Sequence, residues 1–88
     1  MASYHVDFKP SVYKDFRRLP ESVVERAMKR IEQLKDEPLP HGVEKLETAE
    51  RLYRIRIGDY RIVYELEMPV RQIMIHYVRH RREAYRAL

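Results

Sequence analysis

The stretch over residues 52–64 constrains the fold more than any other part of the sequence. Its apolar residues alternate with arginines, which predicts two β-strands joined by a tight turn at Gly58-Asp59. The apolar side chains of this hairpin are Tyr53, Ile55, Ile57, Tyr60, Ile62, Tyr64 and, just beyond it, Leu66. Successive strand residues point to opposite faces, so Arg54, Arg56 and Arg61 are predicted to share the other face. Three guanidinium groups there favour a polyanion-binding face over a merely solvated one.

The length and composition indicate one small domain. The chain has 88 residues, and we expect residues 1–88 to form a single domain. It contains no cysteine, which excludes disulfides and thiolate metal sites. No apolar run approaches the roughly 20 residues of a membrane span, and the first residues do not resemble a signal peptide. We therefore expect a cytoplasmic location and no membrane contact.

Positive charge gathers in the second half of the chain. The net charge is +4, and residues 51–88 hold nine Arg and no Lys against one Asp and three Glu. Arginine forks bind phosphate in a bidentate manner and stack on bases. Tyr53, Tyr60, Tyr64 and Tyr77 are interleaved with these arginines, a pattern typical of sites for single-stranded nucleic acid. For the tyrosines themselves we favour a place in the hydrophobic core, whereas for the arginines we favour a polyanion site.

The remaining segments predict an α+β fold. A short strand over residues 4–8 precedes two amphipathic helices, the first over residues 10–19 and the second from Pro20-Glu21 to the residue before Pro38. Residues 44–50 are ambiguous and include a possible short strand at Lys45-Leu46. We expect the two helices to pack on one face of the sheet and the arginines to occupy the other.

The last strand is predicted over residues 71–79. Both of its faces are fairly apolar, which indicates a central strand. Alternation places Ile73, Ile75 and Tyr77 on one face and Met74, His76 and Val78 on the other. The faces of Arg79 and Arg81 stay open, because a bulge there would change them. Residues 80–88 are predicted to form a short C-terminal helix or tail. The complete predicted fold is an N-terminal strand, a helical hairpin, a curved antiparallel sheet of three to four strands and this C-terminal segment.

Several familiar site motifs are excluded. The chain has only two glycines, so it has no glycine-rich phosphate loop. The helical hairpin does not indicate a helix-turn-helix, because the basic charge lies mostly in the other half of the chain. His76 and His80 lack the helical spacing and the third ligand of a zinc site. Glu65 and Glu67 share a strand face but lie near its end.

The sequence resembles the RelE family of bacterial and archaeal toxins, within the RelE/ParE superfamily. The residues that carry this resemblance are Lys45-Leu46, the hairpin over residues 53–64, and the ending His80-Arg81-Arg82-Glu83-Ala84-Tyr85-Arg86. The resemblance implies a type II toxin–antitoxin toxin that inhibits translation as a ribosome-dependent endoribonuclease cleaving mRNA in the A site. It also implies a RelB-like antitoxin in a toxin–antitoxin hetero-oligomer, with the ribosome and mRNA as further partners.

The resemblance also assigns roles to residues. Arg61 and Arg81 match two family arginines, Tyr85 matches the terminal tyrosine, and Arg54 and Arg56 occupy positions often held by Lys or Arg. The family reaction is attack of a ribose 2′-OH on the adjacent phosphate, so we expect a metal-independent mechanism without a cofactor. We expect Arg61 and Arg81 to stabilise the transition state.

The general base is predicted to be Tyr85, with His80 as the alternative. The remaining RNA-binding residues are predicted to be Lys45, Arg51, Arg79, His80 and Arg82. Two other functions stay open. One is a ParE-like inhibitor of DNA gyrase, and the other is a non-catalytic module that binds RNA or an antitoxin on the same scaffold.

Overall fold

The computed structural model describes residues 3–47 and 50–86, with side chains through Glu83. The elements in chain order are β1 (His5–Phe8), α1 (Pro10–Arg18), α2 (Glu21–Leu34), β2 (Glu44–Lys45), β3 (Leu52–Ile57), β4 (Tyr60–Glu67), the 3-10 helix η1 (Met68–Val70), β5 (Gln72–His80) and α3 (Arg81–Arg86). The predicted α+β class and order of elements are confirmed. In the described part of the chain, no helix is both long and apolar enough to cross a membrane.

The five strands form one sheet in the order β1-β5-β4-β3-β2. The strands from β2 to β5 pair antiparallel, as predicted. The prediction did not place the N-terminal strand. In the structure, β1 joins the same sheet and pairs parallel with β5, so that Val6 lies opposite Ile73 and Phe8 lies opposite Ile75. This pairing joins segments far apart in the chain, which local sequence patterns do not report. It also makes β5 an interior strand, as expected.

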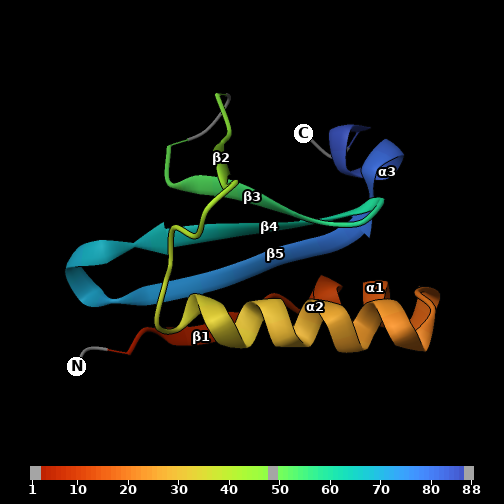
Figure 1. Cartoon of the computed structure of the whole chain (residues 1–88), viewed down its shortest axis with the longest axis horizontal. Helices are drawn as coiled ribbons and strands as arrows, with labels where there is room; N and C mark the ends of the chain where they lie inside the picture. The colour runs from red at the N-terminus through yellow and green to blue at the C-terminus, as the bar shows by residue number, and fades with distance from the viewer. Residues whose placement is uncertain (1–2, 48–49, 87–88) are drawn as a thin grey trace.

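The helices cover one face of the sheet. Helices α1 and α2 lie together on one side of the strands, whereas α3 lies on the other side (Figure 1). The main core consists of Val12 of α1, buried residues of α2 such as Ala27 and Ile31, and the apolar stripes of β3, β4 and β5. We call the sheet face away from α1 and α2 the open face.

The hairpin has the predicted register. Ile55 lies opposite Ile62, and Arg56 lies opposite Arg61. Ile55 and Ile62 belong to the main core, so the arginines of this hairpin point to the open face, as predicted. Gly58 in the turn has a φ of +61°, a backbone conformation that glycine adopts without steric cost.

Strand β5 contains a bulge that corrects the predicted alternation. Val63 pairs with Tyr77 and Tyr64 with Ile75, so His76 is an extra residue. The side-chain pattern is therefore reversed beyond His76. Val78, not Tyr77, joins the main core, and Tyr77 packs with Leu46 and Val63 in a smaller cluster on the open face. The prediction for Tyr77 and Val78 was wrong because the bulge is not visible in the apolar pattern.

Candidate nucleic-acid interface

Three arginines lie side by side across the open face. Arg56 of β3 is the register partner of Arg61 of β4, and Arg61 is in turn the partner of Arg79 of β5. We call these three residues the arginine row. The bulge at His76 brings Arg79 onto this face, so its place beside Arg61 depends on that irregularity. Arginines opposite one another repel, which makes the row costly unless anions neutralise it.

Arg61 is the most buried member of the row. It is only 5% exposed. Its Nη1 donates to the carbonyl oxygens of Gly58 at 3.0 Å and Tyr60 at 2.9 Å, while its Nε–H is buried without a hydrogen-bond partner. Among the described residues, no carboxylate pairs with its guanidinium. A charge held this far from water without a counter-ion is unfavourable, and a bound anion would relieve that cost.

Glu44 of β2 pairs with two of the predicted arginines. Its carboxylate lies 2.6 Å from Nη2 of Arg54 and 3.1 Å from Nη2 of Arg56. The hydrogen bond and charge of Arg54, with a smaller contribution from Arg56, lower the pKa of Glu44 below its ordinary value. Sequence analysis missed Glu44, since the ambiguous segment that begins there gave no sign of its place next to β3. Its carboxylate neutralises part of the positive charge that these two arginines bring to the open face.

Asp15 of α1 is the second carboxylate at the edge of this face. It lies 3.3 Å from Nε of Arg79, whose guanidinium carbon lies 4.7 Å from the centre of the Tyr77 ring. Burial raises the pKa of Tyr77, and the nearby charges of Arg79 and Arg54 only partly oppose this. The Tyr77 phenol is therefore a hydrogen-bonding group and a platform for Arg79 rather than a base. Sequence analysis did not single out Asp15.

The residues at the end of β5 and the start of α3 are divided between the two sides of the sheet. Arg81 and Arg82 are exposed at the start of α3, and the backbone N–H of Arg81 donates to the carbonyl of Asp59 at 2.8 Å. His80 lies opposite Tyr60 on the helix side of the sheet. The rings of the two residues meet edge to face. His80 is thus separated from the arginine row. The side chain of Tyr85, the other predicted base, lies outside the described residues.

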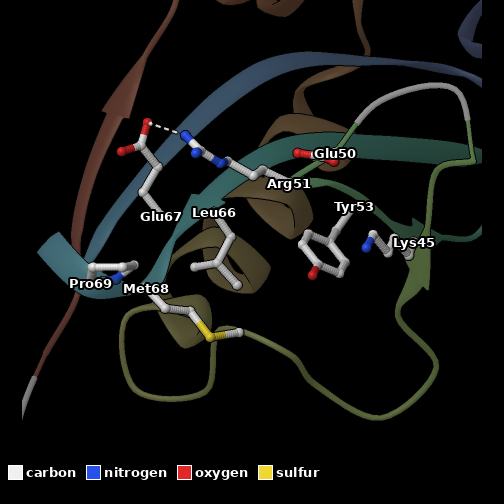
Figure 2. A pocket seen from close by; sticks show the side chains of 8 residues that line it. All are labelled: Lys45, Glu50, Arg51, Tyr53, Leu66, Glu67, Met68 and Pro69. Carbon is white, nitrogen blue, oxygen red and sulfur yellow. Dashed lines mark ion pairs between the residues drawn. The ribbon is translucent and has the colours of Figure 1, made fainter.

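Lys45 and Arg51 do not join the arginine row. They line a hollow at the end of the β3–β4 hairpin opposite its turn, together with Tyr53 and Leu66, and Figure 2 shows Arg51 paired with Glu67, 3.6 Å away. The arginine row lies at the turn end of the same hairpin. The structure thus brings Arg54, Arg56, Arg61 and Arg79 together and leaves Lys45 and Arg51 apart.

One acid–base pair on the open face was not anticipated. Nε2 of His76, the extra residue of the bulge, lies 3.0 Å from Oε1 of Glu65. From the sequence, His76 was weighed only as a zinc ligand and Glu65 only as a partner of Glu67. Among the described residues, there is no group of three or more His, Cys, Asp or Glu side chains that could hold a metal ion.

The fold and this face define a small α+β domain with four arginines on one sheet surface, where Glu44 pairs with Arg54 and Arg56 and Asp15 pairs with Arg79. Comparison with known proteins agrees with this description. Residues 6–85 match the family model described as "ParE toxin of type II toxin-antitoxin system, parDE". The chain belongs to the ParE/RelE toxin family and is a toxin of a type II toxin–antitoxin system. The resemblance to RelE toxins in the sequence is thereby confirmed.

Individual relatives give the extent of the similarity. A curated protein of Methanocaldococcus jannaschii named "Putative toxin RelE1" is 31% identical over 86 residues, which cover 94% of this chain and 96% of the relative. The archaeal RelE–RelB complex of Pyrococcus horikoshii contains a chain 32% identical, with a TM-score of 0.79 and coverage of 90% of this chain and 96% of the other. The RelBE2 complex of Mycobacterium tuberculosis gives 25% identity, a TM-score of 0.76 and coverage of 89% and 98%.

Proposed function

We propose that this protein is a ribosome-dependent endoribonuclease that cleaves mRNA in the ribosomal A site and thereby inhibits translation. Membership of the toxin family and similarity to RelE chains support this activity. The single observation that carries the proposal is Arg61, a buried guanidinium without a carboxylate partner in the described structure, in the middle of a row of arginines. Such a row suits the closely spaced charges of an RNA backbone.

The proposed reaction is a transfer within the RNA. The ribose 2′-oxygen forms a bond to the adjacent phosphorus while the bond from phosphorus to the 5′-oxygen of the next nucleotide breaks. The products are a 2′,3′-cyclic phosphate and a free 5′-hydroxyl. Charge grows on the phosphate oxygens in the transition state. We assign its stabilisation to Arg61 and Arg81, as the resemblance implies, and to Arg79 as a further donor beside Arg61. This scheme needs no metal or cofactor, because the arginines supply the positive charge.

We assign proton transfer to Tyr85, whose side chain lies outside the described residues. An arginine is a poor base because it stays protonated, and His80 lies on the helix side of the sheet. Weak acid–base groups make the geometry of the RNA decisive. Alignment of reacting groups supplies about 7–11 kcal/mol, so we propose that the ribosome provides it and that free RNA is cleaved poorly.

An antitoxin resembling RelB is the proposed regulator. The similar chains from Pyrococcus horikoshii and Mycobacterium tuberculosis are each in a complex with an antitoxin. We propose that an antitoxin forms a hetero-oligomer with this toxin in the cytoplasm and covers the arginine row. An acidic segment of the antitoxin would neutralise the charge that otherwise attracts RNA.

Inhibition of DNA gyrase is the second candidate function. The description of the matching family model, a ParE toxin, favours it. A gyrase inhibitor would not require the arginine row as a phosphate site, so the two candidates make different predictions for Arg61.

The deciding experiment is in vitro translation with the purified toxin, followed by primer extension on the mRNA and a parallel gyrase supercoiling assay. Discrete cuts at ribosome-occupied codons, absent without ribosomes, are expected. The double variant with Arg81→Ala and Tyr85→Phe is expected to bind ribosomes but not to cleave. Intact mRNA together with blocked supercoiling would favour the gyrase function, and intact mRNA with active gyrase would indicate a module that only binds.

A further inference from the structure

Asp15 is a buried carboxylate with two bonds to β5. It is 8% exposed. Its Oδ2 accepts the backbone N–H of Val78 at 3.2 Å, and its Oδ1 accepts Nε–H of Arg79 at 3.3 Å. Strand β1 pairs with β5 only as far as Ile75, so the N–H groups of β5 beyond this residue need other acceptors. The bond to Val78 meets that need, but the bond to Arg79 does not serve the sheet.

Arg79 is held from two directions. Asp15 binds its Nε–H at the edge of the sheet, and the ring of Tyr77 lies 4.7 Å from its guanidinium carbon. Its side chain is 30% exposed, which leaves part of the guanidinium accessible. A free arginine side chain has about 2 kcal/mol of rotamer entropy. Here much of that entropy is lost on folding, so less has to be lost when a phosphate binds.

We propose that Asp15 is a positioning residue that holds Arg79 beside Arg61 before RNA arrives. Arg61 is the direct cross-strand partner of Arg79 and repels it. Without the carboxylate, the Arg79 side chain would turn toward solvent and away from the arginine row. This inference rests on the proposed function, because it assigns Arg79 to the phosphate site of the cleavage reaction.

The test uses a variant that keeps the structural bond and removes the charge. In Asp15→Asn, the amide oxygen still accepts the Val78 N–H, but the amide NH2 faces the Arg79 donor. If the Asp15→Asn variant fails to fold, Asp15→Ser is used in its place, because serine keeps a short oxygen acceptor. Asp7→Asn is the matched control, since it removes the same charge from an exposed carboxylate whose partners are His5 and Gln72.

Three quantities are measured on each folded variant. They are the single-turnover rate of mRNA cleavage on programmed ribosomes, ribosome binding, and hydrogen exchange at Nε–H of Arg79 by NMR. We expect Asp15→Asn to cleave about ten- to a hundredfold more slowly, the range typical for loss of an outer-shell partner. Ribosome binding is expected to persist, and exchange at Arg79 is expected to accelerate. Asp7→Asn is expected to match the parent in all three.

A double-variant comparison separates positioning from a purely structural role. In an Arg79→Ala background, Asp15→Asn is expected to slow cleavage no further, because the group that it positions is gone. Parental cleavage by Asp15→Asn, or the same slowing with and without Arg79, would overturn the inference.

A parent that does not cleave would defeat the proposed function but not this test. The affinity for a 2′-O-methylated RNA oligonucleotide would then decide the matter. Several-fold weaker binding by Asp15→Asn but not by Asp7→Asn would support positioning of an anion-binding arginine, and equal affinities would overturn it.

Discussion

Arg61 combines a stability cost with the proposed catalytic role. Its guanidinium is buried with two carbonyl acceptors and no carboxylate partner in the described structure. Arg61→Met replaces it with an apolar side chain of similar length. We expect the free energy of unfolding to stay equal or to rise, because no buried charge remains to be desolvated. Cleavage on ribosomes should fall about a hundred- to a thousandfold.

Thermal unfolding and single-turnover cleavage of the two proteins test this prediction. Arg17→Ala is the matched control, since Arg17 is an exposed arginine of α1 on the helix side. A large loss of stability in Arg61→Met would show that Arg61 is a structural arginine. Full cleavage by that variant would remove it from the phosphate site.

Glu44 makes the neutralisation of Arg54 and Arg56 dependent on pH. Because the folded pKa of Glu44 is lowered below 4.5, its ion pairs contribute stability above pH 4.5 and lose it as the pH falls through the lower, folded value. In Glu44→Gln this contribution is absent at every pH. Urea unfolding of both proteins across this range should therefore show their stabilities converging below pH 4.5. A constant difference would contradict the assigned pairing.

The same variant tests competition with RNA. Removing the carboxylate removes the ion pairs that Glu44 makes with Arg54 and Arg56 on the open face. At neutral pH, Glu44→Gln is expected to bind an uncleavable RNA several-fold more tightly and with a steeper dependence on salt. Titration at several salt concentrations measures both quantities. Equal or weaker binding would place the RNA away from Arg54 and Arg56.

At the scale of elements, the β3–β4 turn connects the fold to the site. Gly58 has a φ of +61°, a Cβ there would lie 3.2 Å from Nη2 of Arg26, and its carbonyl accepts the Arg61 guanidinium. Gly58→Ala is expected to cost about 1–2 kcal/mol of stability for the backbone conformation alone, and to slow cleavage by displacing Arg61.

Gly42→Ala supplies the control for this substitution. Gly42 has a φ of +86°, but nothing lies within 4 Å of an added Cβ. It is expected to lose stability through its backbone alone and to cleave normally. Unfolding and cleavage assays on the two variants compare them directly, and an equal effect of both on cleavage would show that the turn does not position Arg61.

The sequence predicts a structural feature well when the residues that determine it are neighbours in the chain. Alternation along β3 and β4 placed Arg54, Arg56 and Arg61 on one face because each strand is regular. A bulge in β5 stayed an open alternative, and its position at His76 could not be predicted, since Met74 and His76 fit either face of an interior strand. Arg79 was consequently named only as an RNA-binding residue. Asp15 is 64 residues from Arg79 in the chain, so no local pattern could join them.

At the scale of the whole molecule, the two faces of the sheet have separate tasks. The helices and the apolar stripes of the strands form the core on one face. The charged arginines lie on the open face, because burying a charge in the apolar core would be costly. Helix α3 follows β5 directly and places Arg81 next to the Asp59 end of the hairpin turn. The fold therefore brings Arg56, Arg61 and Arg79 and the backbone of Arg81 to the turn end of the hairpin.

Salt dependence tests this division of faces. Each phosphate neutralised on single-stranded RNA gives a slope of about −0.7 in log affinity against log salt. The arginine row predicts a slope of about −2 for an uncleavable oligonucleotide. Arg56→Ala is expected to make the slope less negative, and Arg17→Ala, on the helix side, is expected to leave it unchanged. Identical slopes for all three proteins would show that RNA does not bind the open face.

The most direct measurement uses an mRNA with a single 2′-deoxyribose at the position that is cut in the A site. On programmed ribosomes, the toxin is expected to cleave the all-ribose mRNA to a 2′,3′-cyclic phosphate and to leave the deoxy-substituted mRNA intact at that position. This result would establish attack by the 2′-oxygen on the adjacent phosphate. Cleavage of both mRNAs, or of neither, would contradict the proposed reaction.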